Sequence, residues 1–130
     1  MRTSSDIQPP VALIAARAAA SKKAIDPVVL DVSPLLGITD SFVIASAGNP
    51  RLVRTIADEV EKQVKEAGGG APLRVEGLDD ARWVLLDYGA TVVHVFLDEA
   101  REFYDLERLW STATRVDWDE AERVGAGERL

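Results

Sequence analysis

The segment Trp83–Trp110 constrains the fold more than any other part of the chain, because two strands and a helix follow one another there without a spacer. Two apolar runs flank Gly89-Ala90, and glycine at the first central position is typical of a two-residue hairpin turn. This turn sets a register in which Trp83 lies opposite Phe96 and Leu85 lies opposite His94. Both faces of the hairpin are mostly apolar. We therefore expect a sheet covered on two sides and an α/β fold.

The rest of the chain predicts further strands and helices in alternation. Asn49-Pro50 indicates a helix start, with Asn49 as the N-cap and Pro50 at the first helical position. The predicted helices span 11–23, 50–67 and 98–110, and the predicted strands span 28–32, 41–47, 73–76, 83–88 and 91–96, with a loop over 34–37. This order predicts a mixed sheet of about five strands flanked by helices.

The domain organisation follows from where this pattern begins and ends. Residues 1–10 are polar and end in two prolines, which predicts a disordered lead, and residues 11–110 form the predicted domain. Residues 111–130 are acidic, contain glycine and show little periodicity, so we expect a mobile tail. Trp118 is the one large apolar residue in that tail, and this prediction does not explain it.

Composition excludes several kinds of protein. The chain has no cysteine, and the apolar run Ala12–Ala20 is interrupted by Arg17 and is too short to span a bilayer. We therefore expect a soluble, cytoplasmic protein without a membrane anchor. The net charge is −7, with ten carboxylates against five arginines from Asp98 onward. Such a chain is a poor candidate for direct DNA or RNA binding but suits a basic protein partner, although solubility alone also explains the charge.

The candidate catalytic residues are few. His94 is the single histidine, and Asp87 lies diagonally across the hairpin from it, but no Ser or Thr nucleophile accompanies them. Asp31 and Asp87 stand alone on their strands, whereas metal-assisted phosphoryl transfer needs paired carboxylates on one face. We therefore predict no catalytic residues, no metal, no cofactor and no enzyme activity. We expect His94 to be a buried histidine bonded to a carboxylate or a backbone carbonyl.

Six ordered sequence blocks resemble the Iojap family, the ribosomal silencing factors. The blocks are Leu30-Asp31-Val32, Thr39–Ile44, Val75-Glu76-Gly77, Asp87-Tyr88-Gly89, Val93–Phe96 and Tyr104–Trp110. The resemblance implies a fold related to the nucleotidyltransferases without their active site. It also implies a repressor that binds the large ribosomal subunit through its fourteenth protein and blocks joining with the small subunit when nutrients are short. Homodimers are a further family property.

Aromatic residues surrounded by charge are the candidate partner-binding residues, because such rings commonly anchor protein interfaces. Trp83 follows a charged loop, and Tyr104 falls off the apolar stripe of the last helix, on a face shared with Arg101, Glu107 and Arg108. We assign Trp83, Tyr104, Glu107, Arg108 and Asp87 to this site. Ordinary core aromatics are the alternative for the two rings, and the family resemblance favours the interface.

A possible anion site lies where the second predicted helix begins. Arg51 and Arg54 occupy its first turn, near backbone N–H groups that can hold an anion. The alternative, which we favour, is that both arginines pair with carboxylates such as Asp58. The family often has a histidine after this first arginine, and Leu52 stands there instead. A nucleotide-binding or nucleotidyltransferase-like small enzyme with a pocket over 48–54 is the rival function.

Overall fold

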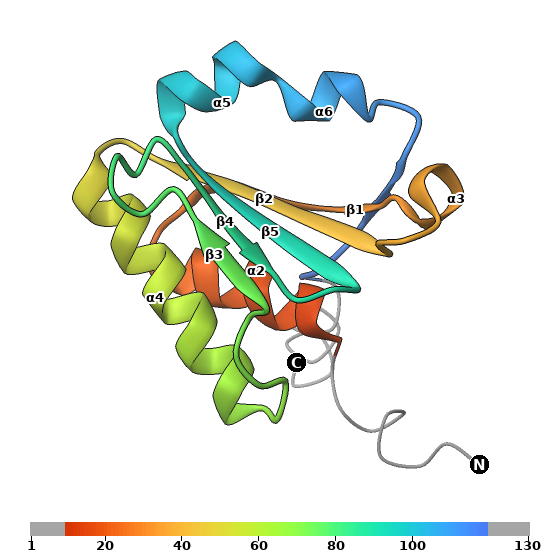
Figure 1. Ribbon diagram of the computed structural model, residues 1–130. Coiled ribbons are helices and arrows are strands. Elements are labelled where there is room, and N and C mark those ends of the chain that lie inside the picture. The colour runs from red at the N-terminus through yellow and green to blue at the C-terminus, as the bar shows by residue number, and fades with distance from the viewer. Residues whose placement is uncertain (1–9, 120–130) are drawn as a thin grey trace, which may run out of the picture.

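In the computed structural model, which describes residues 10–119, one six-stranded sheet carries helices on both faces (Figure 1). The helices are α2 (Val11–Ser21), α3 (Ser33–Leu36), α4 (Pro50–Glu66), α5 (Asp98–Tyr104) and α6 (Leu106–Leu109). The strands are β1 (Ile25–Asp31), β2 (Ser41–Ala47), β3 (Arg74–Glu76), β4 (Trp83–Asp87), β5 (Thr91–Leu97) and β6 (Thr114–Val116). Their order in the sheet is β3-β4-β5-β2-β1-β6. Among the strands of residues 10–119, only β2 and β5 pair in parallel, so the predicted mixed α/β sheet is confirmed.

The hairpin of β4 and β5 has the register that the sequence predicts. Trp83 pairs with Phe96, and Leu85 pairs with His94. Gly89 adopts φ +85°, a left-handed conformation that glycine reaches without steric cost, so the two-residue turn closes as expected.

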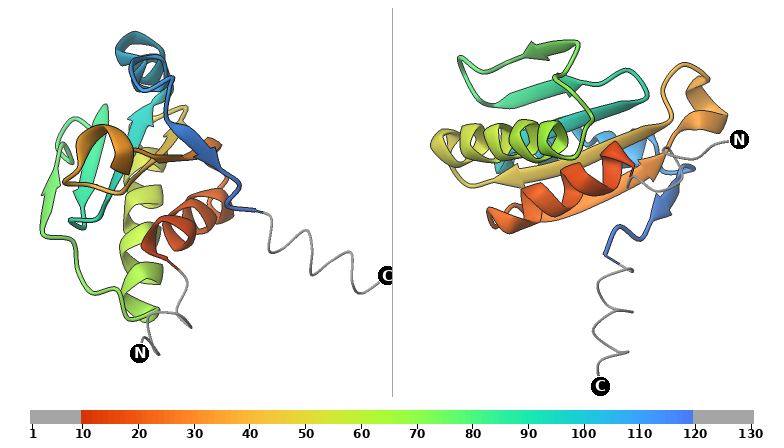
Figure 2. Two further views of the ribbon diagram at one scale, coloured as in Figure 1. Left: turned by 90° about the vertical axis from the view of Figure 1, so that its right-hand side faces the viewer. Right: turned by 90° about the horizontal axis from the view of Figure 1, so that it is seen from below.

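The sheet is buried on both faces, as the apolar hairpin predicts. Helices α2 and α4 lie side by side under one face, and α5 with α6 cross the other (Figures 1 and 2). The α2–α4 side buries small and β-branched residues of the central strands, including Val43, Ala45, Val84 and Val95. The opposite side buries larger ones, including Phe42, Ile44 and Phe96.

Helix α4 confirms the prediction made from its sequence. Asn49 caps it, its side-chain oxygen accepting from the Leu52 N–H at 2.8 Å, and Pro50 occupies the first turn. The buried face consists of the apolar residues that recur at helical spacing, Val53, Ile56, Ala57, Val60 and Val64.

The last predicted helix is not continuous. It breaks at Asp105, whose φ of +50° places it in the left-handed region, and the chain restarts as the single turn α6. Aspartate tolerates this conformation better than most residues. The predicted loop at 34–37 also differs, because Ser33–Leu36 forms the short helix α3, which Gly37 ends at φ +79°.

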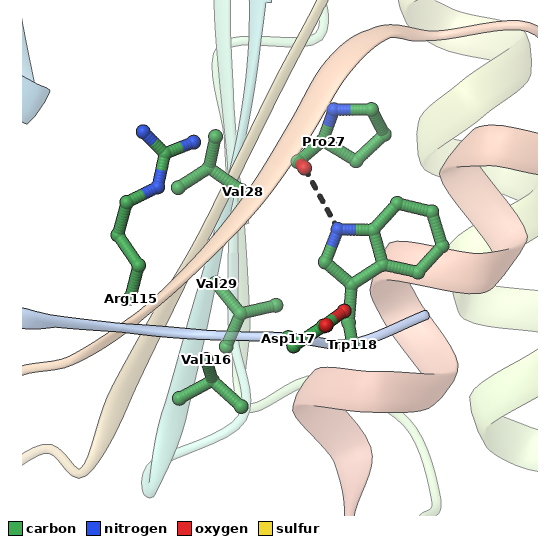
Figure 3. A pocket seen from close by; sticks show the side chains of 7 residues that line it. All are labelled: Pro27, Val28, Val29, Arg115, Val116, Asp117 and Trp118. Atoms are coloured by element: carbon green, nitrogen blue, oxygen red, sulfur yellow. Dashed lines mark hydrogen bonds between the residues drawn. The ribbon is translucent and has the colours of Figure 1, made fainter. Parts of the chain in front are cut away.

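The described part of the predicted tail, residues 111–119, has structure, so that prediction is wrong there. Strand β6 pairs antiparallel with β1 and becomes an edge of the sheet. The Trp118 indole N–H donates to the Pro27 carbonyl at 2.8 Å, beside a hollow of about 290 Å³ between β1 and β6 (Figure 3). The free edge of β1 supplies a pairing partner that local periodicity does not reveal. Residues 1–9 of the predicted lead and residues 120–130 of the tail lie outside the described residues.

Trp118 should therefore contribute to stability. We expect Trp118→Ala to lower the free energy of unfolding by about 2–3 kcal/mol, since a half-buried indole and its hydrogen bond are both lost. Trp118→Phe keeps most of the apolar contact and should cost about 1 kcal/mol. Urea denaturation of the full chain measures both changes. A Trp118→Ala variant as stable as the parent would show that the contact of Trp118 with Pro27 contributes nothing to stability.

Candidate docking surface

Trp83 and Tyr104 lie in contact, although they come from β4 and α5. Their ring centroids are 4.8 Å apart, and Trp83 also stacks on Phe96 at 5.0 Å. Trp83 is half-buried, whereas Tyr104 is 46% exposed. The two aromatic residues singled out in the sequence therefore form one partly exposed cluster.

Phe103 and Leu109 extend this cluster to the surface, and the sequence pattern does not single them out. They are 77% and 70% exposed, and the Phe103 ring lies against Tyr104 at 5.1 Å. Phe103 lies within α5, before the break at Asp105, and Leu109 lies after it in α6. A solvent-exposed hollow of about 590 Å³ is lined by Glu102, Phe103, Tyr104, Asp105, Arg108 and Leu109. We call these six residues together with Trp83 the aromatic surface.

Arg108 belongs to the aromatic surface, but the Glu107 side chain is bonded to Arg101 within the domain. The Glu107 carboxylate accepts two hydrogen bonds from the Arg101 guanidinium, at 3.0 and 3.1 Å. The sequence predicts that Arg101 shares an exposed helix face with Tyr104. This prediction is wrong, because Arg101 is only 8% exposed. A charge reversal at Glu107 would disturb this internal ion pair as well as any partner contact.

Asp87 lies at the far end of β4 from Trp83, at the hairpin turn. Its carboxylate accepts from the Gly89 N–H at 2.8 Å and pairs with Arg74 at 3.4 Å. These bonds close the turn. The structure therefore places Asp87 apart from the aromatic surface, and its assignment to the partner-binding site stays a prediction.

His94 is buried beneath the aromatic surface, but its partner is not a carboxylate or a carbonyl. Its Nδ1 accepts from the Trp83 indole N–H at 3.1 Å, which corrects the expected contact with Asp87. Burial lowers the pKa of His94 to about 4. The ring is therefore neutral near pH 7, and because Nδ1 accepts, the proton resides on Nε2.

The depressed pKa of His94 predicts an acid-sensitive fold. In the unfolded chain the histidine gains a proton below its ordinary pKa of 6.5, while the folded one stays neutral until about 4, so stability falls with pH across this window. His94 alone should contribute a loss of up to about 3 kcal/mol between pH 7 and 4, at 1.36 kcal/mol per pKa unit. Urea titrations at several pH values measure it. His94→Asn keeps every carboxylate but lacks the histidine, so its stability should fall less between pH 7 and 4. An equal fall in the free energy of unfolding of the two proteins would contradict the prediction.

The contacts of Arg54 reduce support for an anion site shared with Arg51. The Arg54 guanidinium donates to the backbone carbonyls of Leu78 and Asp79, at 3.0 and 2.7 Å, and so fastens the loop before β4. Within residues 10–119, neither arginine forms an ion pair with Asp58. The favoured alternative, in which they pair with Asp58, is therefore wrong. The engagement of Arg54 also reduces support for a nucleotide pocket over 48–54.

The described part of the chain shows neither a metal-binding cluster nor a membrane-spanning helix. Among residues 10–119, no three or more His, Cys, Asp or Glu side chains gather where they could hold a metal ion. None of the helices in that same range is long and apolar enough to cross a membrane. The aromatic surface is the strongest candidate site, because its exposed rings are typical of protein-binding domains.

The chain matches the family model described as "Ribosomal silencing factor during starvation" over residues 5–129. It is 41% identical over 106 residues to ribosomal silencing factor RsfS of Bacillus subtilis, covering 82% of this chain and 89% of that one. It is 34% identical over 85 residues to the mouse protein named mitochondrial assembly of ribosomal large subunit protein 1, covering 64% of this chain and 37% of that one. A crystal structure of protein CV0518 from Chromobacterium violaceum superposes with a TM-score of 0.74 at 35% identity, covering 78% of this chain and 83% of that one. The chain therefore belongs to the ribosomal silencing factor family, and the resemblance found in the sequence is confirmed.

Proposed function

We propose that this protein binds the large ribosomal subunit and represses translation by excluding the small subunit when nutrients are limiting. The family membership supports a role in regulating translation at the ribosome. The name of the mouse relative associates that protein with the large subunit. Steric exclusion needs affinity and bulk but no chemistry, which agrees with the lack of a predicted catalytic set.

The observation that carries the proposal is the aromatic surface itself. Phe103, Tyr104 and Leu109 expose apolar area that a folded domain normally buries, and Glu102 and Asp105 line the same hollow. Arg108 lines it too, so two carboxylates and one guanidinium surround the apolar anchors. The excess of carboxylates suits a basic protein, since opposite potentials speed the encounter and the rings supply affinity. The fourteenth protein of the large subunit is the partner that the family implies.

Subunit joining tests this function directly. Purified large and small subunits, mixed with excess protein, are separated on sucrose gradients. We expect the protein to co-sediment with the large subunit alone and the joined ribosome peak to shrink. Undiminished joining at saturating protein would refute the proposal. Binding to the small subunit alone would reverse the assignment of the partner.

Phe103 provides the sharpest test of the surface. Phe103→Ala should weaken binding to large subunits at least tenfold, or about 1.4 kcal/mol, because an exposed ring is an anchor only in the complex. Stability should change by less than about 0.5 kcal/mol, as for other surface sites. Ile38→Ala is the matched control, since Ile38 is a highly exposed apolar residue outside the aromatic surface. Equal binding by both variants would move the docking site elsewhere.

A homodimer and a cytoplasmic location are further proposals. The sheet ends in two short strands, β3 and β6, and exposed edges favour pairing with another chain. Light scattering coupled to size-exclusion chromatography measures the oligomeric state. A monomeric mass across the micromolar range would exclude the dimer.

A further inference from the structure

We infer that His94 is a positioning residue for Trp83: it holds the indole N–H inside the domain, so that the aromatic surface offers its partner a ring face and not a hydrogen-bond donor at this position. The inference rests on the proposed docking role of the aromatic surface. It adds a residue that lies beneath that surface and acts only through the indole.

The geometry fixes the indole in two ways. Trp83 pairs with Phe96 across the hairpin, and stacking of the two rings at 5.0 Å with 30° between their planes sets the tilt of the indole. His94 lies two residues before Phe96 on the same face of β5, within diagonal reach of the long Trp83 side chain. The 3.1 Å bond from the indole N–H to Nδ1 then decides which edge of the indole faces inward.

His94 is itself held firmly enough to serve as a fixed acceptor. It is 4% exposed, and the Phe42 ring meets it edge-on at 4.8 Å. A side chain that is already ordered loses less conformational entropy on binding, so fixing Trp83 in the free protein increases affinity without any added contact.

The orientation also defines the chemistry that Trp83 recognises. Trp83 and Leu85 line a hollow of about 260 Å³ with Glu76 and Gly77. Because the N–H is already bonded within the domain, the exposed part of the half-buried indole offers carbon atoms and not a donor, which suits apolar groups. The Glu76 carboxylate already pairs with Arg74 at 2.8 Å, so an apolar partner side chain fits this position best.

The test compares two substitutions of similar size at one position. In His94→Asn the amide oxygen takes the place of Nδ1 and accepts from the indole, whereas His94→Leu offers no acceptor. NMR follows the Trp83 indole N–H, assigned by its loss in Trp83→Phe, and co-sedimentation measures affinity for large subunits. We expect slow indole exchange in the parent and His94→Asn, and fast exchange with at least tenfold weaker binding in His94→Leu.

Three outcomes would overturn the inference. The first is unchanged affinity for large subunits in a folded His94→Leu variant whose indole exchange has become fast. The second is an equal loss of affinity in His94→Asn and His94→Leu. The third is slow indole exchange in both of these variants. If His94→Leu does not fold, His94→Gln replaces it, since its longer side chain displaces the acceptor from the indole. In the Trp83→Phe background, the difference between the variants at position 94 should vanish, and its persistence would show that His94 acts on other groups. Normal binding by a folded Trp83→Ala variant would instead refute the docking role of Trp83. Slow indole exchange in the parent would then still show that the His94–Trp83 bond forms, so the two failures are distinguishable.

Discussion

Replacing Arg101 with methionine is expected to lower the free energy of unfolding by about 3–5 kcal/mol, because breaking a buried charged network leaves its other members without partners. The Arg101 guanidinium donates to the Ile25 and Asp26 carbonyls, both at 2.8 Å, and to the Ser46 hydroxyl at 3.0 Å. It also holds Glu107 through two bonds. One side chain of α5 thus ties together β1, β2 and α6.

Methionine is the informative replacement, since its length and flexibility preserve much of the packing of the arginine stem. Urea denaturation measures the change in stability. Arg108→Met is the matched control, because Arg108 is exposed on the same segment, and a change within about 0.5 kcal/mol is expected there. A loss below about 1 kcal/mol in Arg101→Met would show that water satisfies the network equally well.

The elements that the sequence predicted correctly are those whose signals are local. The Gly89 turn lies between two apolar runs, and a two-residue connection leaves one register for the hairpin. Helix α4 carries its cap, its proline and its apolar spacing within one segment. In each case the residues that define the element are also the residues that form it.

The elements that the sequence missed depend on distant partners. Thr114–Val116 has no apolar alternation and becomes β6 only because the edge of β1 is free to pair with it. The break at Asp105 is likewise hidden, because no glycine or proline marks it between Asp98 and Trp110. Arg101 resembles an ordinary surface arginine until Ile25, Asp26 and Ser46 are brought against it.

The candidate site could be predicted only in part for the same reason. Trp83 and Tyr104 each suit an interface by their sequence surroundings, and the fold brings them into contact. Phe103 and Leu109 were missed, because apolar residues at helical spacing predict a buried face and these two are exposed. Sequence pattern identifies rings that suit an interface. Only the packing shows which of them remain at the surface.

The loop before β4 provides the second large effect, at Gly77. We expect Gly77→Ala to cost about 2–5 kcal/mol, combining a left-handed backbone penalty of roughly 1–2 kcal/mol with overpacking of roughly 1–3 kcal/mol. Gly77 has φ +88°, and an added Cβ would overlap the carbonyl oxygen of Trp83. Both obstacles involve backbone, so no side-chain rotation can relieve them.

Two other glycines separate these contributions. Gly70 has φ +78° with open space around its Cβ position, so Gly70→Ala should show the backbone penalty alone, roughly 1–2 kcal/mol. Gly48 has neither feature, and Gly48→Ala should change stability little. Urea denaturation of the three variants should therefore give a graded series, with Gly77 the most sensitive. Equal losses at Gly77 and Gly70 would show that the loop moves away from β4 and relieves the overlap. A graded series would mean that glycine is required at position 77 because the loop backbone passes directly over the start of β4, where Trp83 enters the aromatic surface.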